Sequence, residues 1–148
     1  MRTVITNEKD ERFLKLVEEL DMGYYQRIGD ELSKYDEYNS FSTPHVVILL
    51  MDFDRSIACA SYRILDDDCV EFKRVYVKKE YRKKRIAFKL IKKLEKDIIK
   101  KGFKYSYIVT GKNNVAAIKL YEKLDYFKIP NIKGFENDST VISMKKCF

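Results

Sequence analysis

The sequence has few of the residues that build metal centres, disulfide frameworks or hydrolase triads. Its 148 residues include only three cysteines and one histidine. The cysteines are odd in number and form no Cys-x-x-Cys pair, which excludes the common zinc spacings and argues against a disulfide framework. His45 is the only histidine and no serine elbow accompanies it, which argues against a Ser/His/Asp triad. We expect no metal, and we expect Cys59 to be a buried structural thiol.

The sequence also lacks the segments that direct a chain into or across a membrane. No apolar run approaches the roughly 20 residues that a helix needs to span a bilayer. The first residues, MRTVITNEKDERF, contain neither an apolar signal core nor a small-residue cleavage site. We therefore expect a cytoplasmic protein with no membrane partner.

The length and composition favour one folded domain over residues 1–148. A hydrophobic content of 45% is sufficient for a core, and the 36% of charged residues lie within regularly patterned segments, which argues against disorder. The formal charge is +7, from 30 basic and 23 acidic residues. Fifteen of the basic residues fall between Lys73 and Lys104, where Glu80, Glu95 and Asp97 are the acids. This asymmetry indicates an anionic ligand near that segment.

Alternation and turn residues predict a series of strands. DFDR and the Asp66–Asp68 run mark turns between apolar segments, so we expect two antiparallel hairpins. In the strand CVEFKRVYV, Val70, Phe72 and Arg74 should lie on one face, with Glu71, Lys73 and Val75 on the other. The expected strands are Arg2–Thr6, Val46–Asp52, Ser56–Leu65, Cys69–Val77, Tyr105–Thr110, FKIP and TVISMKK.

Helical spacing predicts about four helices around this sheet. The first should be capped by Asn7 and end near Gly23, and a second should lie within Tyr24–Tyr35. A third, with Leu90 and Leu94 on its buried stripe, should end at Gly102. A fourth covers Val115–Leu124. The expected fold is α/β, a twisted, mostly antiparallel mixed sheet of six to seven strands that is splayed between the fourth and fifth strands.

The stretch VYVKKEYRKKRIAFKLIKKLE, from Val75 to Glu95, joins a strand to a helix through a cluster of positive charge. Backbone N–H groups at a helix start have no intrahelical partner, and the helix dipole adds positive charge there. Such an end accepts phosphate oxygens. Three interpretations remain open on this pattern alone: a phosphorylated ligand, nucleic acid, or a solvated lysine-rich helix face.

Two segments in register resemble the GCN5-related N-acetyltransferase (GNAT) family. RKKRIA (Arg82–Ala87) lies where that family has the Arg/Gln-x-x-Gly-x-Gly/Ala loop that binds the pyrophosphate of acetyl-CoA. NVAAIKLYEKLDYF (Asn114–Phe127) is similar to its Asn-x-x-Ala-hydrophobic-x-hydrophobic-Tyr-Glu-x-Leu-Gly-Phe segment. YDEYN (Tyr35–Asn39), IPNIKGF and SMKK resemble a small bacterial subgroup, so the resemblance covers nearly the whole chain. It implies a GNAT fold and an N-acetyltransferase that uses acetyl-CoA as co-substrate.

The chain departs from the family pattern at two glycines. Arg85 replaces the first loop glycine, where its Cβ crowds the pyrophosphate or its guanidinium pairs with a phosphate. The glycine of Leu-Gly-Phe is replaced around Asp125. The resemblance implies the following cofactor-binding residues: Val75, Tyr76, Val77, Arg82, Lys83, Lys84, Arg85, Ile86, Ala87 and Asn114.

Acyl transfer to an amine requires that a proton leave the nitrogen, that charge on the carbonyl oxygen be stabilised and that the CoA thiolate be protonated. The resemblance implies that a backbone N–H of the strand ending at Val77 stabilises the oxyanion. It also implies that the Tyr121 hydroxyl lies near the CoA sulfur as general acid; the alternative is a core tyrosine. Glu71 is our candidate general base, and its alternative is a surface carboxylate paired with Lys73 or Arg63.

The acceptor site is expected to involve aromatic and polar residues, which are Tyr35, Tyr38, Asn39 and Thr110. The alternative for YDEYN is that it packs the second helix onto the sheet. A polyamine, an aminoglycoside, an amino acid or a protein N-terminus all fit as the amine acceptor. A nucleic-acid-binding module and a non-catalytic acyl-CoA-binding protein are the competing functions, although no nucleic-acid-binding motif is present. A homodimer also remains open.

Overall fold

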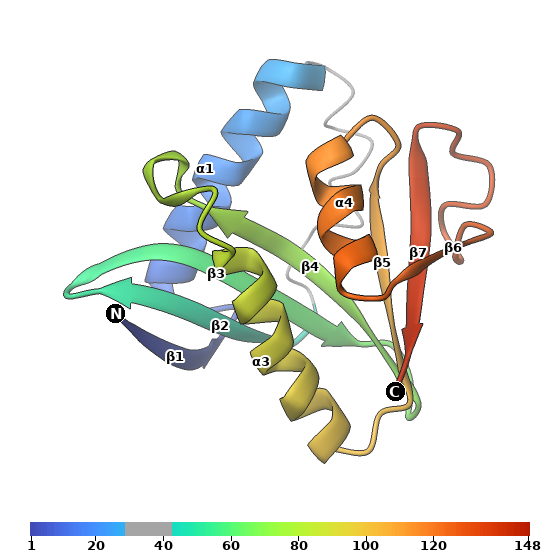
Figure 1. The fold of residues 1–148 in the computed structure, drawn as a ribbon, viewed down its shortest axis with the longest axis horizontal. Coiled ribbons are helices and arrows are strands. Elements are labelled where there is room, and N and C mark those ends of the chain that lie inside the picture. Colours follow the sequence, from blue (N-terminus) through green and yellow to red (C-terminus); the bar gives the residue numbers. More distant parts are fainter. Residues whose placement is uncertain (29–42) are drawn as a thin grey trace.

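A computed structural model describes residues 1–28 and 43–148, which form a twisted sheet between helices (Figure 1). The seven strands follow the order β1-β2-β3-β4-β5-β7-β6, in which β4 and β5 are parallel and every other neighbouring pair is antiparallel. The strands are β1 Arg2–Asn7, β2 His45–Asp52, β3 Arg55–Ile64, β4 Cys69–Val77, β5 Tyr105–Gly111, β6 Phe127–Ile129 and β7 Val141–Cys147. This arrangement confirms the predicted mixed sheet.

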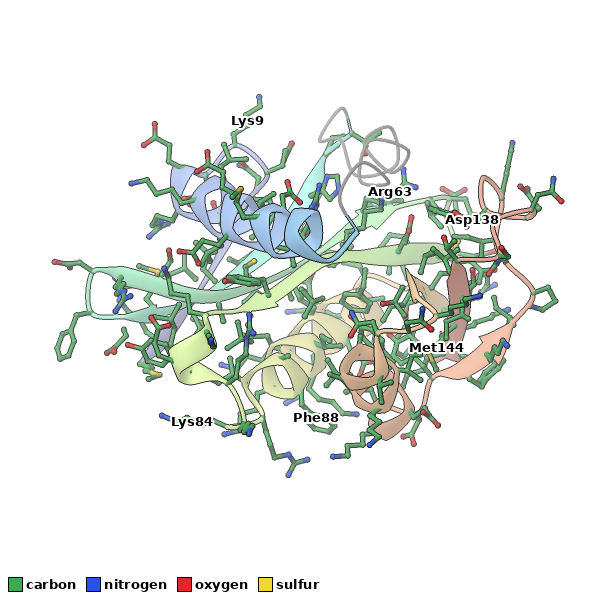
Figure 2. The ribbon with its side chains drawn as sticks, turned by 90° about the horizontal axis from the view of Figure 1, so that it is seen from above. Lys9, Arg63, Lys84, Phe88, Asp138 and Met144 are labelled. Carbon is green, nitrogen blue, oxygen red and sulfur yellow. The ribbon has the colours of Figure 1, made fainter. Side chains whose placement is uncertain are left out.

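Helices cover both faces of the sheet. α1 (Glu11–Ile28) lies on one face, and α3 (Ile86–Lys100) and α4 (Val115–Lys123) lie on the other (Figure 2). The larger apolar core lies under α3 and α4 and includes Tyr62, Phe72 and Leu94. A smaller core lies under α1, where Phe13 and Leu16 are among its members. Within the described ranges there are thus three α-helices and one short 3-10 helix, η2 (Lys79–Tyr81), where about four helices were predicted.

The start and end predicted for the first helix were wrong. Asn7 ends β1, and it is Asp10 that caps the helix, because its carboxylate accepts a hydrogen bond from the Arg12 N–H at 2.9 Å. Gly23 lies inside α1, which continues to Ile28. The predicted second helix is therefore in part the end of α1, and the remainder of that prediction lies outside the described residues.

A β-bulge in β4 overturns the predicted alternation of its side chains. β3 advances from Cys59 to Ser61 while their partners in β4 run from Tyr76 to Lys73, so β4 contains one extra residue. Arg74 has a positive φ of 54° at this point. Its side chain reaches Asp21 on α1, whereas Val75 packs into the core under α3. The faces predicted for these two residues are thus exchanged, because the insertion reverses the period-two pattern.

The predicted splay lies between β4 and β5. The two strands pair from Cys69 to Phe72 on one side and from Tyr105 to Ile108 on the other, and no pair follows among the described residues. The separation begins directly before the bulge. Beyond it, β4 continues to Val77 and leads through η2 into α3, as the sequence predicted.

Candidate functional site

The loop between β4 and α3 presents a run of backbone N–H groups. From Lys83 to Phe88, none of these groups has a hydrogen-bond partner within the part of the chain that the structure describes, and Arg85 gives α3 no side-chain cap. Lys83 and Arg85 have positive φ values of 66° and 59°. Left-handed residues alternating with right-handed ones turn successive N–H groups toward a common point, which makes a concave anion-binding nest.

Four cationic side chains surround these N–H groups. Three of the charged ends lie against aromatic rings: Arg82 is 5.6 Å from the Tyr76 ring centre, Lys84 is 5.8 Å from that of Tyr81 and Arg85 is 4.7 Å from that of Phe88. No ion pair joins Arg82, Lys83, Lys84 or Arg85 to a carboxylate of the described residues, so their charge is available to an anion. Arg82 also donates to the Val77 carbonyl at 2.9 Å, which ties the loop to the end of β4. The nest and these charges together suit a pyrophosphate.

The bulge lies beside the opening between the strands. Arg74 and Val75 stand opposite a single residue of β3, the Cys59 thiol donates to the Arg74 carbonyl at 3.3 Å, and the pairing of β4 with β5 ends at Phe72. The side chains of Val75 and Val77 pack against the core under α3, while Tyr76 packs under α1. This irregular end of β4 is the place where the resemblance implies an oxyanion donor.

Glu71 is buried and held by an arginine. Arg63 donates to Oε1 of Glu71 from Nε at 3.0 Å and from a terminal nitrogen at 2.8 Å, and 2% of the Glu71 side chain is exposed. The strand register places one row of residues side by side across β2, β3, β4 and β5. In order, they are His45, Arg63, Glu71 and Tyr107. Figure 2 shows Arg63 on the α1 side of the sheet. The structure thus contains the Arg63 pairing that was the alternative to a catalytic role.

A buried lysine near the bulge was not singled out from the sequence. Lys73 precedes Arg74 and is 9% exposed. Burial lowers its pKa from 10.5 to about 8, although the Glu71 carboxylate acts in the opposite direction. Burial also lowers the pKa of His45, whose Nδ1–H donates to the Thr43 carbonyl at 2.7 Å. No sequence signal distinguishes Lys73 from the many exposed lysines, because its burial follows from strand register.

Tyr121 is 6% exposed and lies in the last turn of α4, in the core under that helix. Its ring meets that of Tyr126 edge-on, with the ring centres 5.9 Å apart. Asn114 caps α4, since its side chain accepts from the Ala117 N–H at 3.2 Å. Thr110 follows Ile108 by two residues in β5, so it shares the face of that core residue and lies on the opposite face from Glu71.

The remaining candidates for the acceptor site, Tyr35, Tyr38 and Asn39, lie outside the described residues. The described part of the chain holds no group of three or more histidine, cysteine, aspartate and glutamate side chains arranged to bind a metal ion. None of its helices combines the length and apolar content needed to cross a membrane.

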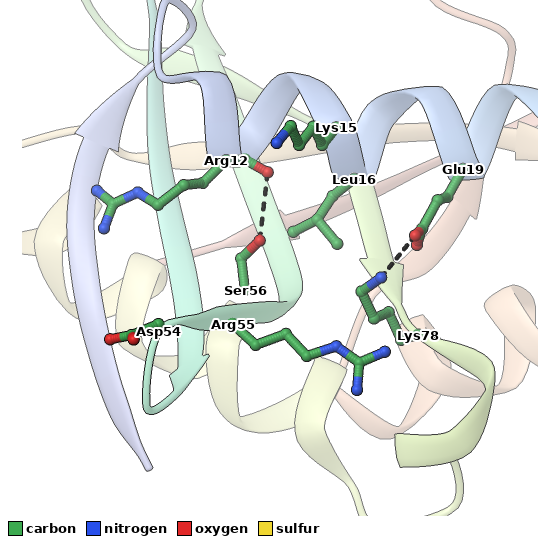
Figure 3. Close-up of a pocket in the computed structure, with 8 residues that line it drawn as sticks. All are labelled: Arg12, Lys15, Leu16, Glu19, Asp54, Arg55, Ser56 and Lys78. Carbon is green, nitrogen blue, oxygen red and sulfur yellow. Dashed lines mark hydrogen bonds and ion pairs between the residues drawn. The ribbon is translucent and has the colours of Figure 1, made fainter.

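A hollow of about 260 Å³ lies apart from the loop, between α1 and the turn after β2 (Figure 3). Most of its cations already have carboxylate partners: Lys78 lies 2.5 Å from Glu19, Arg55 lies 3.0 Å from Glu80 and Arg12 lies 2.8 Å from Asp10. These pairs reduce the charge that the hollow offers to an anion. A second hollow, of about 440 Å³, is lined by loop residues between β6 and β7, among them Asn131.

Comparison with known proteins gives a family for this architecture. A model of the acetyltransferase (GNAT) family matches residues 13–126. Among solved structures, a protein from Klebsiella pneumoniae described as an acyl-CoA N-acyltransferase is 22% identical, with a TM-score of 0.78, and the match covers 98% of this chain and 97% of that one. No curated protein sequence gives a match.

Two further structures contain the coenzyme. PaiA N-acetyltransferase from Thermoplasma acidophilum, in complex with coenzyme A, is 19% identical, with a TM-score of 0.72 and coverage of 98% and 99% of the two chains. A GNAT acetyltransferase from Elizabethkingia anophelis, with acetyl-CoA bound, is 17% identical, with a TM-score of 0.63 and coverage of 81% and 84%. At these identities, the structural matches establish the shared fold.

Proposed function

Because the chain belongs to the acetyltransferase (GNAT) family and is an acyltransferase, we propose that it transfers the acetyl group of acetyl-CoA directly to a primary amine of a small molecule or peptide. The observation that carries this proposal is the nest of N–H groups from Lys83 to Phe88, next to the end of a strand that diverges from its neighbour. The coenzyme bound to the Thermoplasma and Elizabethkingia structures supports it.

The loop residues would hold the coenzyme through its pyrophosphate. The amides of Arg82–Ala87 were expected to bind phosphate oxygens; because the Arg82 N–H donates to the Lys79 carbonyl at 3.3 Å, we propose that the amides from Lys83 onward do so, and that Arg82 contributes its guanidinium with the other cations of the loop. Arg85 already has the left-handed backbone that a glycine would adopt there, so the loop keeps its shape despite the substitution. The cofactor-binding role of Val75, Tyr76, Val77 and Asn114 belongs to the same proposal.

Three groups would carry the chemistry. A backbone N–H of β4, near its end at Val77, donates to the developing oxyanion of the thioester carbonyl. The Tyr121 hydroxyl protonates the departing thiolate, since phenol and thiol pKa values lie within a unit or two of each other. Glu71 accepts the proton of the attacking amine directly or through water. The two hydrogen bonds from Arg63 hold the Glu71 carboxylate in one orientation.

The acceptor is proposed to bind from the α1 side of the opening, where Glu71, Lys73 and Tyr107 lie. Tyr35, Tyr38 and Asn39 remain proposed contacts, and Thr110 is proposed to reach the acceptor from the opposite face of the sheet. A polyamine, an aminoglycoside, an amino acid and a protein N-terminus are the acceptor classes to compare.

Thermal unfolding with acetyl-CoA, CoA and duplex DNA in parallel tests the proposal. Acetyl-CoA should raise the Tm in proportion to the logarithm of its concentration, with an effect at micromolar concentration. Stabilisation by DNA alone, with a steep dependence on salt, would favour a nucleic-acid-binding protein. If acetyl-CoA gives no shift at millimolar concentration, coenzyme binding is wrong.

Release of CoA thiol in the presence of spermidine, kanamycin, lysine, an unblocked peptide and hydroxylamine then measures transfer. Tyr121→Phe removes only a hydroxyl, so kcat should fall by ~10²–10⁴ with little change in the affinity for acetyl-CoA. Stabilisation by acetyl-CoA without transfer to any of these amines would favour a non-catalytic acyl-CoA-binding protein.

A further inference from the structure

Tyr126, which has no role in the proposed function, lies at the centre of a buried polar network. Its hydroxyl lies 2.5 Å from the Ser106 hydroxyl and donates to Oε2 of Glu95 at 3.2 Å. The other carboxylate oxygen of Glu95 accepts from Lys146 at 3.0 Å. Tyr126 is 4% exposed, and Ser106 and Glu95 are buried as well. Two elements, β5 and α3, therefore meet at the Tyr126 hydroxyl, and β7 joins the network through the bond of Lys146 to Glu95.

The same residue is in direct contact with Tyr121. The two rings are 5.9 Å apart at an interplanar angle of 64°, and the Tyr126 N–H donates to the Tyr121 carbonyl at 2.9 Å. Tyr126 thus touches both the ring and the backbone of Tyr121. A ring anchored at its hydroxyl limits the rotamers open to the ring packed against it.

The network also connects Tyr121, through Tyr126, to the elements that border the opening between the strands. Ser106 pairs with Val70 in the stretch where β4 and β5 still run together, and the pairing ends two residues later at Phe72. Glu95 lies on α3, the helix that begins at the nest. The two elements that anchor Tyr126 are therefore those that border the opening and the proposed coenzyme loop.

We propose that Tyr126 is a positioning residue for acyl transfer, which holds the Tyr121 hydroxyl at the CoA sulfur through its own anchored ring. This inference rests on the proposed function and on the role given there to Tyr121. Burial raises the pKa of Tyr126, so its hydroxyl stays protonated and keeps donating to Glu95. Tyr126 therefore acts through Tyr121 and exchanges no proton with the substrate.

The test uses Tyr126→Phe, which keeps the ring and removes the anchor. Tyr62→Phe is the matched control, because Tyr62 is also fully buried and donates to a carboxylate of α3, that of Asp97, at 2.6 Å. Both variants lose a comparable hydrogen bond and should lose comparable stability. Steady-state rates are measured well below both Tm values, as thiol release with the fastest of the five amines named above. Ser106→Ala removes the anchor from the other side and serves if Tyr126→Phe does not fold.

Tyr126→Phe is expected to lower kcat by about 10-fold to 100-fold with an unchanged KM for acetyl-CoA, since a small misplacement of a reacting group costs that much. Tyr62→Phe should keep the wild-type kcat. If Tyr126 acts through Tyr121, the double variant Tyr121→Phe/Tyr126→Phe should be no slower than Tyr121→Phe alone.

A wild-type kcat in Tyr126→Phe overturns the inference, and so do losses that multiply in the double variant. An equal loss in Tyr62→Phe also overturns it, because the effect would then be one of general stability. If Tyr121→Phe lowers kcat while Tyr126→Phe does not, the proposed function stands without the inference. A wild-type rate in Tyr121→Phe removes the role of Tyr121 and the inference with it, as does the absence of transfer to every amine.

Discussion

Arg85 and Asp125 share a backbone conformation that neither side chain favours. Their φ values are 59° and 71°, in the left-handed region. Arg85 precedes α3 and Asp125 follows α4, so one stands at a helix start and the other beyond a helix end. Both occupy positions where the family segments have glycine. The chain has therefore kept the two turns and lost the residue that adopts them without steric cost.

Arg85→Gly should stabilise the fold and weaken coenzyme binding. Relief of the left-handed strain, less the entropy that glycine adds to the unfolded chain, gives about 0.5–1 kcal/mol. Loss of one cation at the nest should raise the Kd for acetyl-CoA about 2-fold to 5-fold at low salt, and less at high salt. Chemical unfolding and calorimetric titration measure the two effects.

Arg85→Lys is the control for charge and should bind acetyl-CoA about as wild type does. Tighter binding by Arg85→Gly would show instead that the arginine Cβ crowds the pyrophosphate.

Asp125→Gly isolates the backbone effect at a site with no proposed ligand contact. The free energy of unfolding should rise by about 0.5–1 kcal/mol. Asp125→Ala should fall below wild type, because aspartate tolerates the left-handed region better than alanine does. Urea unfolding of the three proteins measures this order. If alanine proves as stable as glycine, the conformation of the turn changes on substitution and strain is not the cause.

The sequence predicted the bounds of β4 to the residue but assigned the wrong faces to Arg74 and Val75. A period-two pattern carries no mark of an inserted residue, and neither residue is an obvious bulge former. The predicted start of α1 was wrong for a related reason. Asn7 and Asp10 are both good caps, and the choice depends on where the preceding strand ends.

For the candidate site as well, the sequence indicates local features but not contacts between separate segments. The nest could be predicted because a loop and a helix start are local features of the sequence. Three other features depend on how separate segments of the chain pack together. They are the ion pair of Glu71 with Arg63, the burial of Lys73 and the hydrogen bond between Tyr126 and Ser106. Those contacts depend on register, which local patterns do not determine.

The burial of Lys73 should make stability depend on pH in the alkaline range. Its pKa is 10.5 in an unfolded chain and about 8 in the fold, so between these values the unfolded state binds more protons and stability rises with pH. The shift corresponds to about 3 kcal/mol. Lys73→Met lacks this cost, so its stability relative to wild type should decrease by about that amount from pH 7 to 10.5.

Urea unfolding at several pH values measures this difference. Lys96→Met, at an exposed position of α3, is the control and should differ from wild type by a constant amount. A constant difference for Lys73→Met as well would mean that the ammonium group reaches water in the folded protein.

Glu71 and Arg63 provide a test that separates a general base from a structural ion pair. Glu71→Gln keeps the size of the side chain and removes its charge, so a base role predicts a lower rate at neutral pH and a flatter acidic limb of the pH–rate profile. Arg63→Met leaves the carboxylate without its cationic partner. A purely structural pair predicts that both variants lower the Tm, by an amount typical of a broken buried pair, and leave the shape of the profile unchanged.

Profiles of kcat/KM from pH 5 to 10, measured with hydroxylamine and with the best amine acceptor, distinguish the two cases. Hydroxylamine is already unprotonated at neutral pH, so loss of a base should slow its acetylation less than that of an alkyl amine. Equal losses with both acceptors would assign Glu71 to the structure of the site and leave the proton to water.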